Sequence, residues 1–286
     1  MLRAWLLATR PKTLAAAVAP VAVGTALAAT TGPWRLDLAL GCLAGAMLLQ
    51  IGCNFANDAG DALRGADTPD RLGPQRAVAS GLISPRAMLL GAALALLAAA
   101  GVGTWLAAAS GWQLWVVGVA SVVAALAYTL GPVPLAYVGL GDLFVLIFFG
   151  FTAVLGAAWV QDPHWPFPIA WWSAAAGTGL QATVLIAINN LRDIPTDART
   201  GKRTLAVRLG ERGTRLYHSL LHAAAVVCWW HAAGLDAAGT ALVGGLALSA
   251  MVWTSRGREL NRCLGLAALV QLLTAAVAVA GLARWP

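Results

Sequence analysis

Charged residues are scarce in this chain. Asp, Glu, Lys and Arg make up 11% of its 286 residues, whereas they make up about a quarter of an ordinary soluble domain. Hydrophobic residues make up 59%, and the mean hydropathy is +0.74. This composition excludes an ordinary soluble domain and a disordered chain. The net charge of +7 would suggest nucleic-acid binding in a soluble protein, so its meaning depends on where the charges lie.

Three other signals are missing. The four cysteines have no metal-binding spacing and lie in or beside apolar segments, which indicates structural thiols. No segment alternates apolar and polar residues with a period of two, which argues against a transmembrane β-barrel. No charged residue interrupts the long apolar windows at mid-depth, where secondary transporters commonly hold buried charges.

The windows without charge have the length of membrane spans. Seven are 19 to 29 residues long, and an eighth, 87–141, is broken near its middle by Ser110-Gly111. A helix rises about 1.5 Å per residue, so about 20 residues cross a hydrocarbon core of about 30 Å. We therefore predict an all-α polytopic membrane protein, a single integral-membrane domain over 1–286 with nine transmembrane helices in one bundle. The predicted spans are about 13–34, 38–57, 87–109, 112–130, 143–161, 168–191, 216–235, 237–255 and 263–283.

The basic residues predict the orientation of these spans. With a cytoplasmic N-terminus, 17 of the 19 Lys and Arg residues fall on the cytoplasmic side, and only Arg35 and Arg284 fall outside. The net charge then needs no nucleic acid, because basic loops face the anionic lipid surface. We expect a multi-pass protein of the cell (inner) membrane, with its C-terminus on the outer side and with no obligatory protein partner. The first span is expected to be a retained helix rather than a signal peptide.

Acidic residues gather at the predicted cytoplasmic ends of two spans. At the end of the second span, four polar residues are spaced at i, i+3, i+4 and i+7, so on a helix they share one face. They are Asn54, Asn57, Asp58 and Asp61.

The end of the sixth span has a matching pattern. Asn190, Asp193 and Asp197 are spaced at i, i+3 and i+7. Pro195 is expected to bend or end this helix, so that Asp197 lies just beyond it. Both clusters are predicted to lie on the same side of the membrane and at the same depth.

Clustered carboxylates repel one another and are costly near lipid, and a hard divalent cation relieves that cost. Mg²⁺ takes oxygen ligands, commonly one or two carboxylates with water and substrate phosphate. Cationic side chains lie among the acids, as expected where a phosphate is held through a metal. They are Arg64, Arg71, Arg76, Lys202 and Arg203. Two clusters of matching pattern favour this interpretation over ordinary ion pairs in solvated loops.

Asn57-Asp58-x-x-Asp61 and Asp193-x-x-x-Asp197 resemble the two aspartate motifs of the UbiA superfamily of intramembrane polyprenyltransferases, which follow the second and sixth of nine helices. Further blocks are similar to the branch of this superfamily that uses 1,4-dihydroxy-2-naphthoate. They are residues 10–14 (Arg-Pro-Lys-Thr-Leu), 67–74, 80–85, 128–137, 139–142, 189–193 and 201–210. The resemblance covers roughly residues 8–215. Asp142 departs from it, because Glu is expected there.

The resemblance implies an enzyme that transfers a polyprenyl group from an allylic polyprenyl diphosphate to 1,4-dihydroxy-2-naphthoate. Diphosphate and CO₂ are lost and demethylmenaquinol forms, a step of menaquinone biosynthesis. The implied cofactor is Mg²⁺, which stabilises the leaving diphosphate so that the C–O bond can break to give an allylic carbocation. The implied metal ligands are Asn57, Asp58, Asp61, Asn190, Asp193 and Asp197, with Asp61 and Asp193 also taken as catalytic. The implied diphosphate ligands are Lys12, Arg64, Arg71, Lys202 and Arg203.

Assignments on the acceptor side also follow from the resemblance. A carbocation needs an apolar, water-poor pocket with aromatic faces. The candidate faces are Tyr128, Tyr137, Phe148 and Phe149. Asp67 or Asp142 is expected to orient the acceptor hydroxyls or to take a proton, and Tyr128 to take part in catalysis. Arg10 is expected near the acceptor carboxylate, with Tyr137 as a second acceptor-binding residue.

Two alternatives stay open. The aspartate motifs do not determine which aromatic acceptor is used, so 4-hydroxybenzoate or homogentisate is an alternative substrate for the same chemistry. A secondary transporter is the alternative from another class. Transporters often contain inverted repeats, whereas the two acidic clusters here repeat in a parallel sense and lie at one surface.

Overall fold

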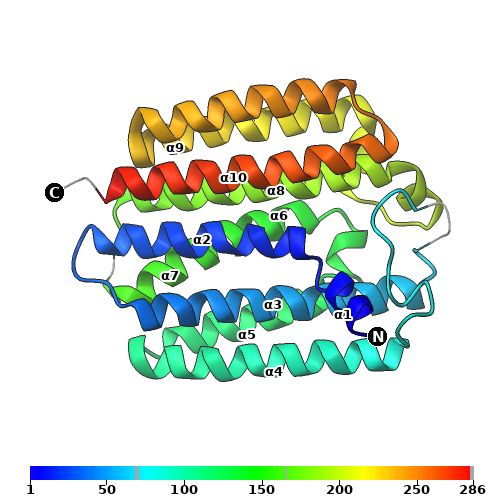
Figure 1. Ribbon diagram of the computed structural model, residues 1–286, viewed down its shortest axis with the longest axis horizontal. Coiled ribbons are helices and arrows are strands. Elements are labelled where there is room, and N and C mark those ends of the chain that lie inside the picture. Colours follow the sequence, from blue (N-terminus) through cyan, green and yellow to red (C-terminus); the bar gives the residue numbers. More distant parts are fainter. Residues whose placement is uncertain (68–70, 165, 284–286) are drawn as a thin grey trace.

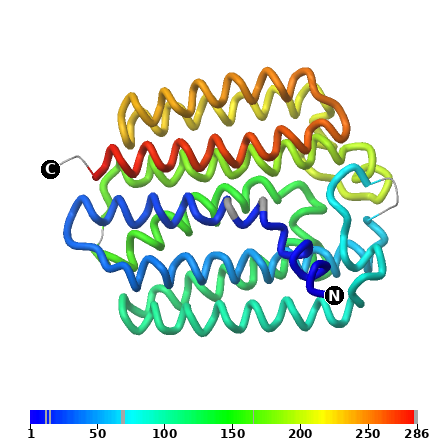
Figure 2. The backbone as a smooth tube through the Cα atoms, in the orientation of Figure 1, coloured from blue at the N-terminus to red at the C-terminus, as the bar shows by residue number. Residues whose placement is uncertain are grey.

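A computed structural model describes residues 1–67, 71–164 and 166–283, apart from the side chains of Lys12 and Ala15. The described part is helical and contains no strand, which confirms the all-α prediction. The long helices lie side by side along one axis, with α1 at one end of the bundle and the last turn of α10 at the other (Figures 1 and 2). The elements are α1 (Leu2–Ala8), α2 (Pro11–Ala29), α3 (Leu36–Leu63), α4 (Pro85–Ser110), α5 (Gln113–Ala127), η1 (Leu135–Tyr137), α6 (Gly141–Val145), η2 (Leu146–Thr152), α7 (Ala153–Gln161), α8 (Ile169–Arg199), α9 (Leu205–Thr254), η3 (Gly257–Glu259) and α10 (Leu260–Leu282).

Each predicted span coincides with a helical segment. Five described segments are long and apolar enough to cross a membrane, and they are Leu36–Leu63, Pro85–Ser110, Gly141–Gln161, Leu205–Thr254 and Gly257–Leu282. Shorter apolar helices cover the first and fourth predicted spans, and α8 covers the sixth. The seventh and eighth spans both lie in α9, which Gly234 divides with a φ of 78°. Nine membrane crossings stay a prediction.

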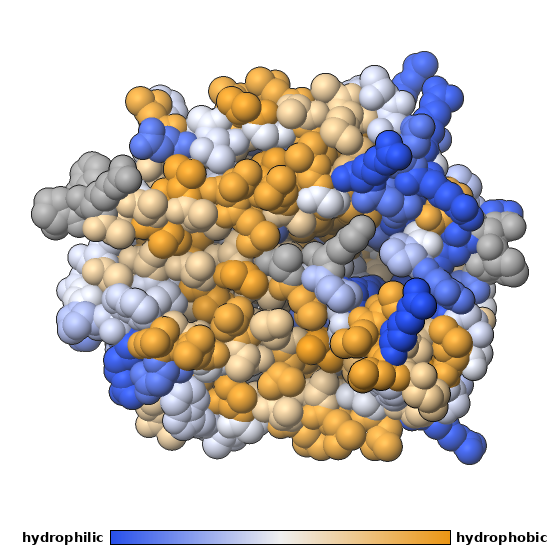
Figure 3. Space-filling model, viewed as in Figure 1, coloured by the Kyte–Doolittle hydropathy of each residue, from blue (hydrophilic) through white to orange (hydrophobic). Residues whose placement is uncertain are grey.

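The surface has the polarity of a membrane protein. Apolar side chains cover the middle of the face in Figure 3, and most polar side chains on that face lie toward the ends of the helices. Leu97 of α4 and Val243 of α9 are both more than two-thirds exposed. Large apolar side chains so exposed are expected where lipid, not water, surrounds the helices.

Small residues let the central helices approach closely. A Cβ at Gly150 would lie 2.7 Å from the carbonyl oxygen of Ala175 and 2.9 Å from the Cα of Gly179 in α8. Lipid tails are as apolar as leucine, so packing of this kind contributes much of the stability of helix contacts in membranes. The contact fixes the segment α6–η2–α7 against α8, which carries the second acidic cluster.

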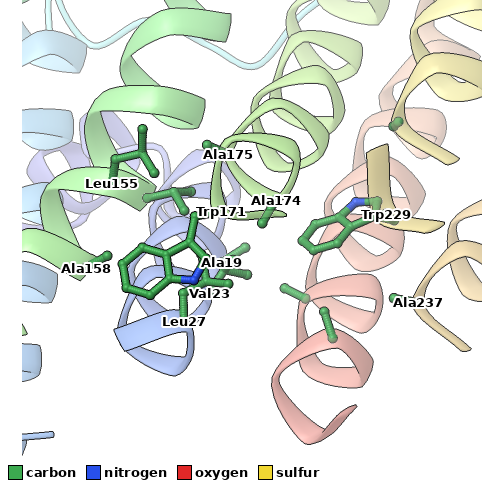
Figure 4. Packing of buried hydrophobic residues seen from close by; sticks show 14 of the residues in the cluster. Ala19, Val23, Leu27, Leu155, Ala158, Trp171, Ala174, Ala175, Trp229 and Ala237 are labelled. Atoms are coloured by element: carbon green, nitrogen blue, oxygen red, sulfur yellow. The ribbon is translucent and has the colours of Figure 1, made fainter. Parts of the chain in front are cut away.

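Two buried tryptophans also pack around α8. Trp171 of α8 packs near α2 and α7, and Trp229 reaches α8 from α9 (Figure 4). The indole N–H of Trp229 donates to the Gln181 side-chain oxygen (3.1 Å), and the Gln181 amide donates to the Thr274 hydroxyl (3.1 Å). These bonds join α8, α9 and α10, so this half of the bundle is held by polar contacts as well as by packing.

The structure corrects the expected end of the sixth span. The helix continues through Pro195 to Arg199, so Asp197 lies on α8 and not beyond it. Proline removes one backbone hydrogen bond, and the Thr196 hydroxyl adds a bond in the same turn by donating to the carbonyl of Asp193 (2.9 Å). Asn190, Asp193 and Asp197 therefore stand on one continuous helix.

A methyl group at position 150 tests the α8 contact. Gly150→Ala is expected to lower the free energy of unfolding by about 1–3 kcal/mol, because its Cβ would overlap the backbone of α8. Thermal unfolding in detergent measures the effect. Gly101→Ala is the control, because a Cβ there meets nothing within 4 Å. Equal melting temperatures for both variants would contradict the contact.

Candidate active site

The last turns of α3 carry the first acidic cluster. Asn54, Asn57, Asp58 and Asp61 are buried and line one cavity, so they share a face of the helix as their spacing predicts. The Thr129 hydroxyl donates a hydrogen bond to the Asn57 side-chain oxygen. All four residues belong to α3, because the helix continues to Leu63.

Asp58 anchors the loop that follows α3. Its two carboxylate oxygens accept hydrogen bonds from the backbone N–H groups of Ala77 and Val78, both at 3.1 Å. The segment 71–78 is thereby folded back over the end of α3. Asp58 is predicted as a metal ligand, whereas in the structure its carboxylate oxygens accept hydrogen bonds from backbone N–H groups.

Asp61 and Asp67 share one arginine. Arg76 lies 3.2 Å from Asp61 and 3.5 Å from Asp67, and Arg71 lies 2.6 Å from Asp67. The Tyr137 hydroxyl also donates to Asp61 (2.9 Å). Burial raises the pKa of Asp67 to about 6, although the positive charge of Arg71 opposes the shift. The predicted role of Asp67, to orient the acceptor hydroxyls or to take a proton, stays a prediction.

The second cluster lies at the end of α8. The Arg192 side chain is fully buried and holds both oxygens of Asp193, with N–O distances of 2.8 and 2.6 Å. It also donates to the side-chain oxygens of Asn189 (2.8 Å) and Asn261 (2.7 Å). The amide of Asn261 donates to the carbonyl of Leu72, so this network reaches the loop after α3.

One tyrosine and one lysine connect the two clusters. The Lys202 ammonium lies 3.9 Å from Asp197 and 5.4 Å from the centre of the Tyr137 ring, whose hydroxyl is bonded to Asp61. The ends of α3 and α8 lie at the same end of the bundle (Figure 1). Asp61 and Asp197 therefore flank one Tyr137–Lys202 pair.

A cavity of 1170 Å³ opens beside these groups. Asn57, Asp61 and Asn190 line its polar end, together with Arg192 and Lys202. Asp193 and Asp197 are not among the described lining residues, since their cationic partners face the cavity instead. Beyond the polar end, the lining is apolar and includes both predicted phenylalanine faces, Phe148 and Phe149.

The predicted acceptor-side residues Asp142 and Tyr128 meet in this cavity. Asp142 is buried near the start of α6 and accepts a hydrogen bond from Tyr217 of α9. The Tyr128 hydroxyl lies beside Gly141, 3.0 Å from where a Cβ would stand. The two groups thus belong to one wall, at the junction of α5, α6 and α9.

Arg10 has an unusual backbone. Its φ of 53° is the only positive value among the described residues other than glycine. Left-handed backbone is costly for such a residue, and residues of this kind cluster at functional sites. Its side chain lines the cavity, and the Nη2 atom is buried without a hydrogen-bond partner. The structure thus offers an unused cationic donor where an acceptor carboxylate is predicted.

The remaining predicted diphosphate ligands differ in position. Arg71 and Lys202 line the cavity. Arg64 is exposed, stacks on the Tyr137 ring at 5.6 Å and donates to the carbonyl of Gly131. Arg203 is exposed, and its backbone N–H donates to the carbonyl of Tyr137 (2.9 Å). The side chain of Lys12 lies outside the described part.

Two residues that hold this site together, Arg192 and Tyr217, are not predicted to belong to it, and Arg76 is predicted only as a cation among the acids. Arg76 bridges two carboxylates from the loop, Arg192 holds Asp193, and Tyr217 holds Asp142. Arg192 stands directly before a motif aspartate, which is a local signal. The sequence around Tyr217 contains no such signal, because its contact with Asp142 depends on how α9 packs against α6.

The donor set fits a metal that shares its ligands with a substrate. Among the described residues, no three His, Cys, Asp or Glu side chains form a group that could hold a metal alone. Buried carboxylate oxygens of Asp67 and Asp197 nevertheless have no hydrogen-bond partner. Mg²⁺ commonly binds one or two carboxylates and completes its shell with water and substrate phosphate. These residues would fit such a shared site.

The chain is similar to proteins of one known family. The UbiA prenyltransferase family profile matches residues 17–264. The chain is 43% identical to the 1,4-dihydroxy-2-naphthoate octaprenyltransferase of Mycobacterium tuberculosis, over 96% of each protein. It is also 43% identical to the protein of that name from Escherichia coli, over 79% of this chain and 75% of that protein.

Solved structures show the same fold. A UbiA homolog from Archaeoglobus fulgidus, bound to DMAPP and Mg²⁺, has a TM-score of 0.72 at 16% identity and covers 99% of this chain and 100% of its own. A UbiA homolog from Aeropyrum pernix has a TM-score of 0.71 at 21% identity, over 93% of this chain and 97% of its own.

The bond between Tyr137 and Asp61 can be tested by binding. Tyr137→Phe is expected to weaken binding of inorganic diphosphate in the presence of Mg²⁺ about tenfold, because Asp61 loses the donor that orients it. Calorimetry on the purified protein gives the affinity. Tyr217→Phe is the matched control, since it removes a hydroxyl from the other carboxylate, Asp142. Equal weakening in both variants would contradict a specific role for Tyr137.

Proposed function

The chain belongs to the UbiA prenyltransferase family, and from this premise we propose that it transfers a polyprenyl group from an allylic polyprenyl diphosphate to 1,4-dihydroxy-2-naphthoate. The products are demethylmenaquinol, diphosphate and CO₂. The observation that carries the proposal is the single cavity with carboxylates and cations at one end and an apolar shaft beyond them. Relatives named 1,4-dihydroxy-2-naphthoate octaprenyltransferase support this choice of acceptor.

The polar end of the cavity suits the diphosphate head group. Asn57, Asp61 and Asn190 supply oxygen atoms at the cavity wall, and Asp193 and Asp197 lie directly behind their cationic partners. Mg²⁺ bound among them would neutralise charge that develops on the leaving diphosphate. Arg71 and Lys202 face the same space and are suited to the phosphate oxygens.

The transfer forms one carbon–carbon bond. The C–O bond of the donor breaks and its electron pair leaves with the diphosphate. A π pair of the acceptor ring then bonds to the allylic carbon, and the carboxylate leaves as CO₂ while its bonding pair restores the aromatic ring. Phe148 and Phe149 line the cavity and exclude water from the allylic cation. Asp142 is suited to orient an acceptor hydroxyl, because Tyr217 fixes its carboxylate.

The protein is a membrane protein, as its apolar helices and its family indicate. We propose nine crossings of the cell (inner) membrane with the carboxylate end of the bundle at the cytoplasmic face. The distribution of Lys and Arg supports this orientation. A cytoplasmic mouth lets a small aromatic acid enter from water while the polyprenyl tail stays in apolar surroundings.

Catalysis depends on the two carboxylate clusters in this proposal. The purified protein with Mg²⁺, a polyprenyl diphosphate and dihydroxynaphthoate is expected to release equal amounts of diphosphate and CO₂. Asp61→Asn and Asp193→Asn are each expected to lower kcat about a hundredfold or more. Asp236→Asn, at an exposed position in α9, is the control. Unchanged turnover in both site variants would refute the site, and turnover with 4-hydroxybenzoate or homogentisate alone would refute the acceptor.

Arg10 is expected to bind the acceptor rather than the donor. Arg10→Gln should raise the KM for dihydroxynaphthoate about tenfold and leave the KM for the diphosphate nearly unchanged, because the acceptor carboxylate loses a charged partner. Steady-state kinetics with each substrate varied in turn measures this. The control is Arg86→Gln, at an exposed position in α4. A rise in the KM for the donor alone would assign Arg10 to the diphosphate.

A further inference from the structure

The cavity follows one face of α3 for most of the length of the bundle. Its lining residues on this helix recur at helical spacing from Asp61 to Cys42. At about 1.5 Å per residue, this stretch is about 28 Å long. The polar lining ends near Gln50, and beyond it the helix presents Leu49, Gly45 and Cys42. A polar head group thus has its place at one end only, and an apolar chain fits along the rest.

Glycines keep the deep part of the cavity open. Gly103 of α4 and Gly156 of α7 both line it, and a Cβ at either position would meet nothing within 4 Å. These two glycines therefore do not serve a close helix contact, in contrast to Gly150. A side chain at either position would enter space that the protein leaves empty.

An apolar cluster lines the far end of the cavity. Leu106 of α4 and Val160 of α7 pack together with Leu38, and Leu114 of α5 packs against them. Leu106, Leu114 and Val160 line the cavity, so we call these three residues the floor. A hydrogen bond joins the ends of α4 and α7 beside the floor: the Ser110 hydroxyl donates to the carbonyl of Val160 (2.7 Å).

A second bond fixes the same corner. The indole N–H of Trp159 donates to the carbonyl of Ser110 (3.0 Å), so two hydrogen bonds join the end of α4 to the end of α7. Close-packed interiors have low compressibility, so this corner is not expected to give way to the end of a bound polyprenyl chain. The side wall differs, because α5 has no buried residue and its valines 119 and 123 are exposed while lining the cavity.

We infer that the floor formed by Leu106, Leu114 and Val160 sets the donor length beyond which further isoprene units no longer raise kcat/KM. This inference rests on the proposed function. Each isoprene unit that enters the apolar shaft gains contact with protein until the chain reaches the floor. Further units must turn aside along α5 toward lipid, where they gain no further contact with the shaft. The selectivity for donor length therefore changes at the depth of the floor.

Variants at the two open glycines shorten the shaft without touching the carboxylates. Allylic diphosphates of increasing length, from geranyl upward, are compared by kcat/KM with Mg²⁺ and dihydroxynaphthoate. Gly103→Leu is expected to lower kcat/KM for the long donors about tenfold and to leave geranyl diphosphate unchanged. Gly101→Leu is the matched control on the same helix, because that position is exposed, does not line the cavity and is equally free of neighbours. Gly156→Leu repeats the test from α7 in case Gly103→Leu folds poorly.

The opposite change lengthens the shaft. Leu106→Ala is expected to move the preferred donor to a longer chain, with geranyl diphosphate again unaffected. Ligand-induced rises in melting temperature provide a readout besides turnover: a long donor with Mg²⁺ should stabilise Gly103→Leu less than the unmodified protein, and geranyl diphosphate should stabilise both equally.

The outcomes separate this inference from the proposed function. A length profile that is identical in the unmodified protein, Gly103→Leu and Leu106→Ala, with transfer intact, overturns the role of the floor and leaves the prenyl transfer standing. Absence of transfer with every donor in the unmodified protein overturns the proposed function itself. Uniform loss across all donor lengths in a folded variant also overturns the floor, because it indicates damage to the head-group site.

Discussion

Buried carboxylates at the ends of α3 and α8 are the constraint on which the rest of the structure depends. An unpaired charge is costly away from water, and each of these groups has a donor or a cation against it. Asp58 accepts hydrogen bonds from backbone N–H groups. Asp61 is paired with Arg76 and accepts a hydrogen bond from Tyr137, and Asp193 is paired with Arg192. These partners come from the loop after α3, from η1 and from α8. The hydrogen bonds and ion pairs of the carboxylates therefore also hold together the segments that form the polar end of the cavity.

The sequence predicts the part of this site that is encoded locally. The face shared by Asn57, Asp58 and Asp61 follows from helical spacing, because three or four residues bring the chain round by one turn. The spacing argument also holds for Asn190, Asp193 and Asp197, but the expected helix end at Pro195 is wrong, because α8 continues through the proline to Arg199. The ion pairs of Arg76 with Asp61 and Asp67, and the contact of Tyr217 with Asp142, escape prediction for a different reason. These contacts are set by how a loop folds back and how two helices pack, and no local pattern records that.

The wall opposite α3 shows how backbone geometry serves both packing and the cavity. Residues 146–152 form a π-helical stretch, which is rare and frequent at functional sites. On one side, Gly150 lies against Gly179 so closely that neither tolerates a side chain. On the other side, the adjacent residues Phe148 and Phe149 both line the cavity. The close contact fixes the depth of α6–η2–α7, and the wider turn presents two aromatic faces in succession.

Charge balance at the mouth argues for joint binding of metal and diphosphate. The carboxylates of the two clusters and of Asp67 are matched by arginines and a lysine in the same space. A bare divalent cation would add positive charge to a balanced site, and a bare diphosphate would add several negative charges, so each alone unbalances it. A metal–diphosphate complex would bring both charges: the carboxylate oxygens would hold the metal, and the arginines and the lysine would bind the phosphate oxygens. A resting site whose carboxylates and cations are paired with one another would therefore favour the complete substrate over either component.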